Sequence, residues 1–406
     1  MDTQEIFKQY VVRAVQVVLQ HTEKDSHPTL REQTRRRALH VLDEYALKLP
    51  ESWTGTRQLL LALAPRLEQA GYRERWIATM TNGLRLSRDQ NDWPVHAELS
   101  LRIGQLYRLM SRFTEAETHL LSSVQSFAEL GDTTKQAQAL NQLAYLACFR
   151  HQYDHSEQLT KQALALVNDQ SLTTAMSFSA LGLVAHFRRQ YTTAIAYHEQ
   201  ALQIRTTHNA HREIAWSLQN LGNTLRSQGE LAAAAKNFEK ALILLTEVED
   251  HAHKAIVQMN LGANYDAQGN AAQGLQLLEE AEPILRSLSD EMNLAKLLTN
   301  KGLCYLTLQF YEQAEIAFAQ SAGLFEALND LSWYLNARDG LGITYLERNW
   351  FDRALQIFES VAARLDEIKG TPAHGFLSTT LVKQLEQARS KNVNRGSSVY
   401  KVDPKR

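Results

Sequence analysis

Apolar residues recur at spacings of three and four along nearly the whole chain, which predicts a succession of amphipathic helices. Short stretches that combine Gly or Asn with polar residues, such as "SQGELAAA" and "AQGNAAQG", interrupt the pattern and indicate turns between paired helices. We therefore expect an all-α fold built from helical hairpins.

The hairpins repeat with a nearly constant period of 38 to 40 residues, marked by a small residue in the first helix of each copy: Gly104, Ala144, Gly182, Gly222, Gly262, Gly302 and Gly342. Twelve positions later each copy carries a second small residue: Ala116, Ser156, Ala194, Ala234, Gly274, Ala314 and Ala354. Sixteen positions after the marker lie Leu120, Thr160, His198, Phe238, Leu278, Phe318 and Phe358. A degenerate earlier copy centres on Ala64, where Trp76 breaks the rule for the second small residue.

A glycine inside a helix costs about 1 kcal/mol relative to alanine, so its return in six copies needs a packing reason. A bare Cα lets the two helices of a hairpin approach closely, and we expect the small residue twelve positions later to form the other half of that contact. Because a single hairpin cannot bury its apolar face alone, consecutive copies must stack into a solenoid.

These spacings, often with a Tyr three residues after the glycine, resemble the tetratricopeptide repeat over roughly residues 56 to 366. The period is about six residues longer than the usual 34, which is similar to the long-helix variant of kinesin light chains, spindle-orientation adaptors and bacterial regulators. The resemblance implies a right-handed α-solenoid, a superhelix of about seven to eight hairpins, with a concave groove lined by the first helix of each pair.

The ends of the chain depart from the repeat. Residues 1–50 read as two amphipathic helices that either cap the solenoid or contact an effector, and residues 51–366 form the solenoid. Residues 367–390 contain a C-terminal capping helix, and residues 391–406 read as a basic disordered tail.

Three asparagines lie two residues before the marker glycine of successive copies: Asn220, Asn260 and Asn300. We expect their carboxamides to point into the groove, where each offers a donor and an acceptor to the backbone of an extended peptide. Similar repeats use asparagines at this place for that purpose, so the resemblance implies the same role. The alternative is that they bond to the neighbouring hairpin and fix the stacking.

Further groove positions on the first helices mix aromatic, amide and charged side chains, a lining that suits a partner with apolar anchors and mixed charge. The set comprises Arg108, Tyr145, His186, Phe187, Trp216, Asn223, Arg226, Met259, Asp266, Lys296, Asn336 and Asp339. By residue type Trp216 is the strongest anchor, although a tryptophan in a repeat helix also fits the core between hairpins.

Composition narrows the classes of function. The net charge is -2 and the body of the chain is mildly acidic, which argues against nucleic-acid binding outside the basic tail. Two cysteines without a CxxC pair suggest neither a disulfide framework nor a thiolate metal site, and no signal peptide or membrane span is apparent. We expect a cytoplasmic monomer without cofactors.

No sequence motif supports catalysis, because phosphate loops and nucleophile elbows are absent and a helical solenoid offers no strand-to-helix turn for them. Histidines occur in two inter-repeat loops, His208 with His211 and His251 with His253, and we interpret them as solvated surface rather than as metal ligands. An enzyme or metalloprotein using this edge is the third hypothesis.

The leading hypothesis is a non-catalytic scaffold or adaptor that binds a peptide or partner segment in the concave groove. The alternative is a signal-sensing regulator whose solenoid binds a ligand or peptide and controls an effector in trans.

Overall fold

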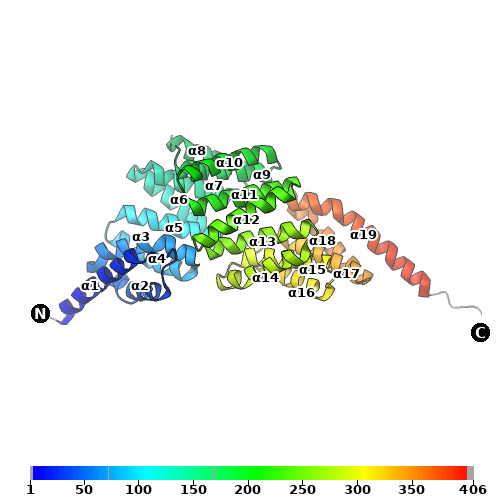
Figure 1. The fold of residues 1–406 in the computed structure, drawn as a ribbon, viewed down its shortest axis with the longest axis horizontal. Coiled ribbons are helices and arrows are strands. Elements are labelled where there is room, and N and C mark those ends of the chain that lie inside the picture. Colours follow the sequence, from blue (N-terminus) through cyan, green and yellow to red (C-terminus); the bar gives the residue numbers. More distant parts are fainter. Residues whose placement is uncertain (1–2, 72, 168–169, 400–406) are drawn as a thin grey trace, which may run out of the picture. The chain divides into compact units, whose positions relative to one another are not determined.

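The computed structural model describes residues 3–71, 73–167 and 170–399, and within them every regular element is a helix. Seven hairpins with the predicted spacing follow one another (Figure 1). They are α5 (Trp93–Leu109) with α6 (Phe113–Leu130), α7 (Thr133–Phe149) with α8 (Tyr153–Leu166), α9 (Leu172–Phe187) with α10 (Tyr191–Thr207), α11 (His211–Gln228) with α12 (Leu231–Glu247), α13 (His251–Ala267) with α14 (Ala271–Ser287), α15 (Glu291–Thr307) with α16 (Tyr311–Ala327), and α17 (Leu331–Glu347) with α18 (Phe351–Arg364). The predicted all-α solenoid is confirmed.

An eighth, degenerate hairpin consists of α3 (Trp53–Ala70) and α4 (Arg73–Asp89). It is preceded by α1 (Thr3–Lys24) and α2 (Glu32–Glu44), with two short 3-10 turns, η1 (Ala46–Lys48) and η2 (Pro50–Ser52). Val15 and Val18 of α1 are buried in one core with leucines of α3, so this helix packs against the first hairpin. A role in contacting an effector stays a prediction.

The C-terminal helix α19 (Pro372–Val399) follows the short turn η3 (Leu365–Ile368), and its Leu377, Leu381 and Ala388 are buried in one core with α17 and α18. It begins where the capping helix was expected and continues past residue 390, where the sequence predicted a disordered tail. No proline lies between Pro372, at the start of the helix, and Pro404, so no proline stops the helix at 390. Residues 400–406 of that tail lie outside the described residues.

Short, similar turns set the hairpin geometry. At α5–α6, Ser111 adopts a left-handed φ of 58° and the amide of Arg112 donates to the carbonyl of Tyr107 at 2.9 Å. This is the six-to-one bond of a Schellman cap, and it recurs in most of the later turns. Several helices then start with an aspartate that caps a backbone amide, for example Asp132 and Asp330.

The marker glycines explain how the two helices of a hairpin approach. A Cβ on Gly222 would lie 2.6 Å from the ring of Phe238, and one on Gly302 would lie 2.7 Å from Phe318. The close partner is therefore the residue sixteen positions later, whose ring or branched side chain lies over the bare Cα. The expected partner twelve positions later also takes part: a Cβ on Gly262 would lie 2.9 Å from the carbonyl oxygen of Gly274, and the hydroxyl of Ser156 donates to the carbonyl of Ala144 at 2.7 Å.

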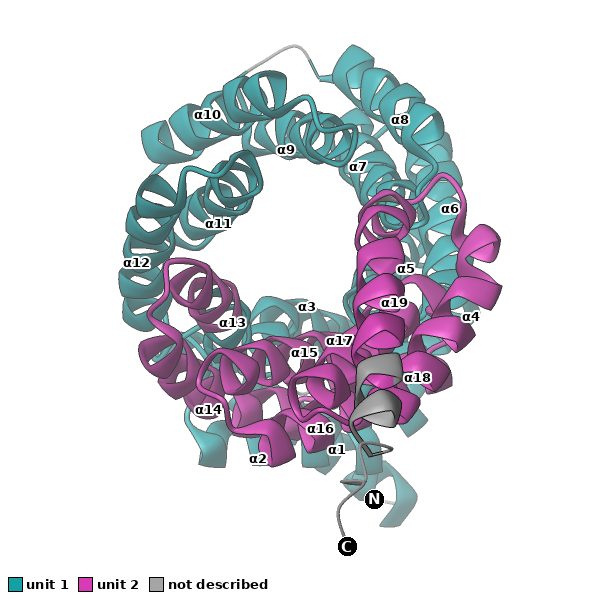
Figure 2. Cartoon of the chain, turned by 90° about the vertical axis from the view of Figure 1, so that its right-hand side faces the viewer, with its two compact units in different colours: residues 1–257 teal, residues 258–406 magenta. Residues whose placement is uncertain are grey.

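The chain divides into two compact units, residues 1–257 and 258–406 (Figure 2). In unit 1 the first helices α5, α7, α9 and α11 lie on the inner side of the curve and their partners lie on the outer side. Unit 2 contains the remaining hairpins from α14 onward and the helix α19. No helix among the described residues is long and apolar enough to cross a membrane.

Candidate functional site

The inner side of unit 1 holds a cavity of about 410 Å³. Its wall comes from α3, α5, α7, α9 and α11 and from the start of α13, which are all first helices of their hairpins. One lining residue, Arg205, comes instead from a second helix, α10. The volume lies within the range typical of small-ligand sites.

Two arginines contribute buried positive charge to this cavity. Nε of Arg108 donates to Oε1 of Gln142 at 2.9 Å, and Nη1 of Arg205 donates to the hydroxyl of Ser217 at 2.5 Å. Arg205 is only 2% exposed, and its Nε has no hydrogen-bond partner among the described residues. Burial lowers the pKa of both guanidinium groups, but arginine stays protonated in proteins.

Aromatic side chains form part of the cavity wall, among them Tyr145 and Trp216. The hydroxyl of Tyr145 donates to the carbonyl of Met176 at 2.9 Å, and its ring lies 5.4 Å from the guanidinium of Arg108. Burial raises the pKa of Tyr145, so the phenol stays neutral. The indole Nε1 of Trp216 is buried without a hydrogen-bond partner in the described part of the chain.

A charged cluster at the edge of the cavity brings α3 together with α11 and α13. Nε of Arg212 donates to Asp250 at 2.6 Å, and the same guanidinium lies 3.8 Å from Glu68. Nδ1 of His253 lies 2.8 Å from Asp250. Burial alone would raise the pKa of Asp250, but His253 and Arg212 outweigh it and hold the pKa far below its usual range.

Two further contacts join the same segments. The side-chain amide of Gln69 donates to the carbonyl of Val248, and Nδ1 of His27 lies 3.1 Å from the carboxylate of Glu249. Segments about 180 residues apart in sequence therefore meet within unit 1, next to the cavity. We call these contacts, together with the Glu68, Arg212, Asp250 and His253 cluster, the clasp.

The three asparagines are divided between the units. Asn220 lines the cavity of unit 1, whereas Asn260 and Asn300 belong to unit 2, where the first is 9% exposed and the second is half-buried. None of the three carboxamides has a hydrogen-bond partner in the described ranges, so the alternative role of bonding to a neighbouring hairpin is not observed there. A continuous ladder of asparagines stays a prediction.

The other predicted groove residues of unit 1 lie on α9 and α11. Nδ1 of His186 lies 3.1 Å from the hydroxyl of Thr224, and burial lowers its pKa to about 4. Arg226 is half-buried and has no carboxylate within ion-pair distance among described residues, and burial lowers its pKa. The carboxamide oxygen of Asn223 is buried without a partner there.

In unit 2 the predicted groove residues are less accessible than a simple groove would require. Met259 and Asp339 are 4% and 3% exposed. Oδ2 of Asp339 accepts from Gln384 of α19 at 3.3 Å, and burial raises its pKa to about 6. Asp266, Lys296 and Asn336 are half-buried, with the Lys296 amine 5.4 Å from the ring of Trp333.

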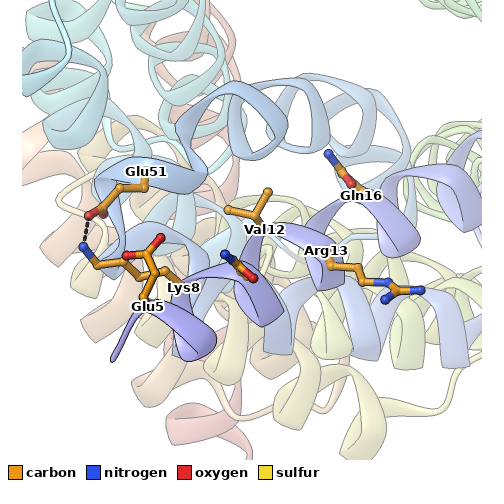
Figure 3. Close-up of a pocket in the computed structure, with 7 residues that line it drawn as sticks. Glu5, Lys8, Val12, Arg13, Gln16 and Glu51 are labelled. Carbon is orange, nitrogen blue, oxygen red and sulfur yellow. Dashed lines mark ion pairs between the residues drawn. The ribbon is translucent and has the colours of Figure 1, made fainter. Parts of the chain in front are cut away.

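A second hollow, of about 390 Å³, lies along α1 and does not resemble a built site (Figure 3). Apart from Glu51 its lining comes from one face of that helix, and the side chains of Glu5, Gln9 and Arg13 are exposed. The amine of Lys8 lies 2.5 Å from Glu51 across one end. Solvated charges of this kind bind weakly, so we place the site in the cavity of unit 1.

Sequence reasoning missed Arg205 because only first helices were considered as groove elements. A signal was present, since Arg205 stands twenty-three positions after a marker glycine, where other copies carry an apolar core residue. The equivalents are Phe127, Val167, Leu245, Leu285, Phe325 and Leu365. The clasp could not be found in the same way, because it joins segments that no periodicity relates.

Within the described ranges no group of three or more His, Cys, Asp or Glu side chains is placed to hold a metal ion. Cys148 and Cys304 are buried, and burial raises the pKa of each thiol to about 12, which makes them poor nucleophiles.

Comparison with known proteins agrees with this architecture. A family model described as a tetratricopeptide repeat matches residues 172–247 and 213–287. None of the curated proteins compared with the sequence matches it.

Three solved structures share the fold at low sequence identity. A signal transduction ATPase with numerous domains (STAND) with a tetratricopeptide repeat sensor, from Pyrococcus horikoshii, aligns at a TM-score of 0.56 and 13% identity over 90% of this chain and 55% of that one. A Rap protein complexed with competence and sporulation factor aligns at 0.55 and 14% over 82% and 99%. Aspartyl phosphate phosphatase F from Bacillus subtilis aligns at 0.52 and 14% over 90% and 95%.

The chain thus spans little more than half the length of the STAND protein, and at these identities the likeness shows the fold alone. The family match covers α9 to α14, and hairpins of the same spacing continue on both sides of it. Residues 172–287 therefore match the tetratricopeptide repeat, within a longer series of hairpins of the same spacing.

Proposed function

We propose that this protein is a non-catalytic interaction module that binds an extended peptide or partner segment against its first helices, with the cavity of unit 1 as the principal contact. The observation that carries the proposal is the cavity lining: Arg205 and Trp216 bring buried polar atoms that have no protein partner among the described residues, and Asn220 lines the same cavity. Buried polar groups without partners are costly, and a ligand that supplies the missing bonds recovers that cost.

The mixed lining suits a peptide better than a purely apolar molecule. Tyr145 and Met176 provide apolar surface, and amide and guanidinium groups lie beside them. A peptide backbone presents donors and acceptors at regular spacing whatever its side chains, which the carboxamides of Asn220 and Gln219 can meet.

The test is affinity capture from a lysate of the source organism with three baits: wild type, Asn220→Ala combined with Trp216→Ala, and Asn237→Ala as a matched control. Asn237 lies on α12, and its carboxamide bonds only within its own helix. We expect at least one protein or peptide to be retained by wild type and control and lost from the double variant, with purified components then reproducing the binding. Equal retention by all three baits would remove the cavity from the proposal.

We infer a second candidate function, a signal-sensing regulator, because the cavity and the clasp share Glu68, Arg212 and His253. A ligand that contacts Arg212 would compete with Glu68, and the contact between α3 and α11 would weaken. Sensing would then be a change in the curvature of unit 1.

Hydrogen exchange measured by mass spectrometry on wild type and Glu68→Gln tests this idea. We expect faster exchange in residues 65–71 and 245–253 of the variant, and the same change in wild type on adding a ligand identified by capture. Glu44→Gln is the control, because Glu44 is exposed and pairs only with Lys48 of a neighbouring turn. If the ligand does not change hydrogen exchange in these segments, the protein binds a partner but does not sense it in this way.

A further inference from the structure

Helix α1 is apolar over more of its surface than the protein core covers. Its buried face includes Val15 and Val18, which lie in one core with leucines of α3. A second apolar surface of the same helix is open to solvent, and we call it the outer stripe. It consists of four residues that are 38% to 68% exposed: Ile6, Phe7, Tyr10 and Val17. A helix at the edge of a protein usually turns polar side chains to water, so this contiguous apolar surface indicates an interaction site.

The outer stripe continues onto the end of α2 through aromatic rings. The rings of Phe7 and Tyr45 meet edge to face with their centroids 6.3 Å apart, and Tyr45 is also exposed. The ring of His40 lies beside Tyr45, with the centroids 5.6 Å apart. Aromatic side chains that combine an apolar body with a polar tip are typical of the boundary between water and an apolar medium.

Basic side chains border the outer stripe, and acidic side chains of α1 lie away from it. Because a helix has about 3.6 residues per turn, Lys24 points in the same direction as Ile6, and Arg13 lies only about 20° from both. Glu5 and Glu23 share another direction, about 100° from that of Ile6. The charge next to the outer stripe is therefore positive.

These bordering cations are not neutralised within the protein. Arg13 and Lys24 are exposed, and neither forms an ion pair with a carboxylate in the described part of the chain. Other cations nearby are paired, since Lys8 lies 2.5 Å from Glu51 and a guanidinium nitrogen of Arg36 lies 2.8 Å from a carboxylate oxygen. An apolar surface bordered by free cations attracts an anionic partner and disfavours a second copy of itself.

We propose that the outer stripe binds the surface of an anionic lipid bilayer. Phe7, Tyr10 and Val17 enter the boundary between headgroups and acyl chains, and the long side chains of Arg13 and Lys24 reach the lipid phosphates. Helices that lie in this boundary have aromatic and apolar side chains on one face and Lys or Arg beside them. The contact is separate from the cavity of unit 1 and goes beyond the proposed function.

The shape of this surface favours a bilayer over a partner helix. An amphipathic partner helix binds by placing its apolar face in a groove. The hollow along α1 lies on the polar side of that helix, with Glu5, Gln9 and Gln16, and contains no residue of the outer stripe (Figure 3). The outer stripe is instead the outward side of a helix, to which lipids adapt without a complementary shape.

Sedimentation of the full-length protein with lipid vesicles tests the proposal. One set of vesicles contains only phosphatidylcholine, and the other also contains the anionic lipid phosphatidylglycerol. We expect binding to the anionic vesicles that weakens as salt is added, and much weaker binding to the neutral ones. No binding to the anionic vesicles would overturn the proposal and would make an acidic partner helix the better occupant.

Removal of the apolar side chains separates specific binding from adsorption. Phe7→Ser combined with Val17→Ser should weaken binding to anionic vesicles by about tenfold or more. Ile243→Ser is the matched control, because Ile243 is an exposed apolar residue on α12. Thermal unfolding of each variant checks that it is folded, and Val17→Ser alone serves if the double variant is not. Equal binding by wild type and the outer-stripe variants would contradict the proposal.

The charge requirement has its own matched pair of variants. Arg13→Gln and Lys24→Gln should each weaken binding to anionic vesicles by about fivefold and reduce its dependence on salt. Arg36→Gln removes an exposed arginine that is already paired, so a smaller loss is expected. If all three variants lose the same affinity, the protein responds only to total charge, and the assigned surface is wrong.

A fluorescent label reports which side of α1 meets the bilayer. Cys148 and Cys304 are buried, so a new cysteine can be labelled selectively with an environment-sensitive dye. The dye attached in Tyr10→Cys should shift its emission to shorter wavelength on anionic vesicles. The dye attached in Gln16→Cys, on the polar side of the helix, should not. An equal shift at both positions, or a shift only in Gln16→Cys, would overturn the assignment of the outer stripe.

Discussion

The two units share their hairpin packing but bury different ionisable groups. In both, a marker glycine receives an aromatic ring from the second helix, as at Gly222 with Phe238 in unit 1 and Gly302 with Phe318 in unit 2. Unit 1 also encloses neutral histidines and unpaired arginines, whereas unit 2 encloses Asp339 with one carboxylate oxygen unpartnered in the described residues.

This difference separates the repeat positions that the hairpin packing requires from those that can vary. The glycine and ring are needed wherever two helices cross closely, so both units keep them. The remaining core positions tolerate polar exceptions, and these exceptions give the units opposite responses to acid. Between pH 7 and pH 5 protonation should weaken unit 1 and strengthen unit 2.

The largest expected effect comes from breaking the shared packing. Gly302→Val in unit 2 and Gly222→Val in unit 1 should each lower the free energy of unfolding by about 3 kcal/mol. The reason is that the new Cβ would lie much closer to the facing ring than van der Waals contact allows. Chemical denaturation followed by far-ultraviolet circular dichroism measures the change.

Gly323→Val is the matched control for both glycine variants. Gly323 also lies inside a helix, α16, but a Cβ there has no atom within 4 Å. Valine should stabilise the protein by a few tenths of a kcal/mol through helix propensity alone. If Gly302→Val were as harmless as this control, the hairpin packing described above would be wrong.

The next largest effect concerns unit 1 in acid. Burial lowers the pKa of His198 to about 3, so the unfolded chain takes up its proton near pH 6.5 while the folded chain does not. The unfolded state then binds more protons than the folded state, and the free energy of unfolding falls by about 2 kcal/mol between pH 7 and pH 5.

His198→Phe should remove that part of the pH dependence, because phenylalanine does not titrate and already occupies the equivalent position in unit 2 at Phe318. Thermal unfolding at pH 7 and pH 5 measures it. The exposed His155 on α8 supplies the control His155→Gln, which should leave the difference between the two pH values as in wild type. An unchanged pH dependence in His198→Phe would contradict the burial of a neutral imidazole.

The smallest effect, of opposite sign, concerns unit 2. Burial raises the pKa of Asp339 to about 6, so the folded state holds a proton that the unfolded state has already released. Stability is therefore lost as pH rises through 6, by about 1 kcal/mol between pH 5 and pH 7. Asp339→Asn should gain stability at pH 7 and little at pH 5.

Local hydrogen exchange in α17 and α19 at the two pH values, corrected for intrinsic rates, detects this change. Asp352→Asn, at an exposed position on α18, should show no comparable gain. The ion-paired Glu282 does not obscure the result, because its lowered pKa places its own loss of stability below pH 4.5. A gain at pH 5 as large as that at pH 7 would refute the raised pKa.

The sequence predicted the fold because each repeat contains the residues that bring its two helices together. Glycine, a small residue and a ring recur at fixed spacing, and spacing alone places them on facing sides of two helices. The position twelve residues on takes part in the contact, as at Ser156 and Gly274, but the side chain sixteen residues on also lies over the glycine. Spacing along a helix gives direction but not the reach of a side chain.

The candidate site was only partly predictable. Tyr145, Trp216 and Asn220 follow from their register on first helices, and the structure places all three on one cavity. Arg205 interrupts an apolar register on a second helix, so the sequence held its signal although the prediction did not use it. The burial of Asp339 could not be predicted, because this residue is covered where α19 packs against α17.

By itself the sequence determined the all-α solenoid and the spacing of its hairpins, because these are local and periodic properties. Only the tertiary structure brought Glu68 to Arg212 and placed Arg205 in the cavity that Tyr145 also lines. Those contacts join segments far apart in the chain, and their formation depends on the accumulated rotation from one hairpin to the next. No single repeat encodes that sum.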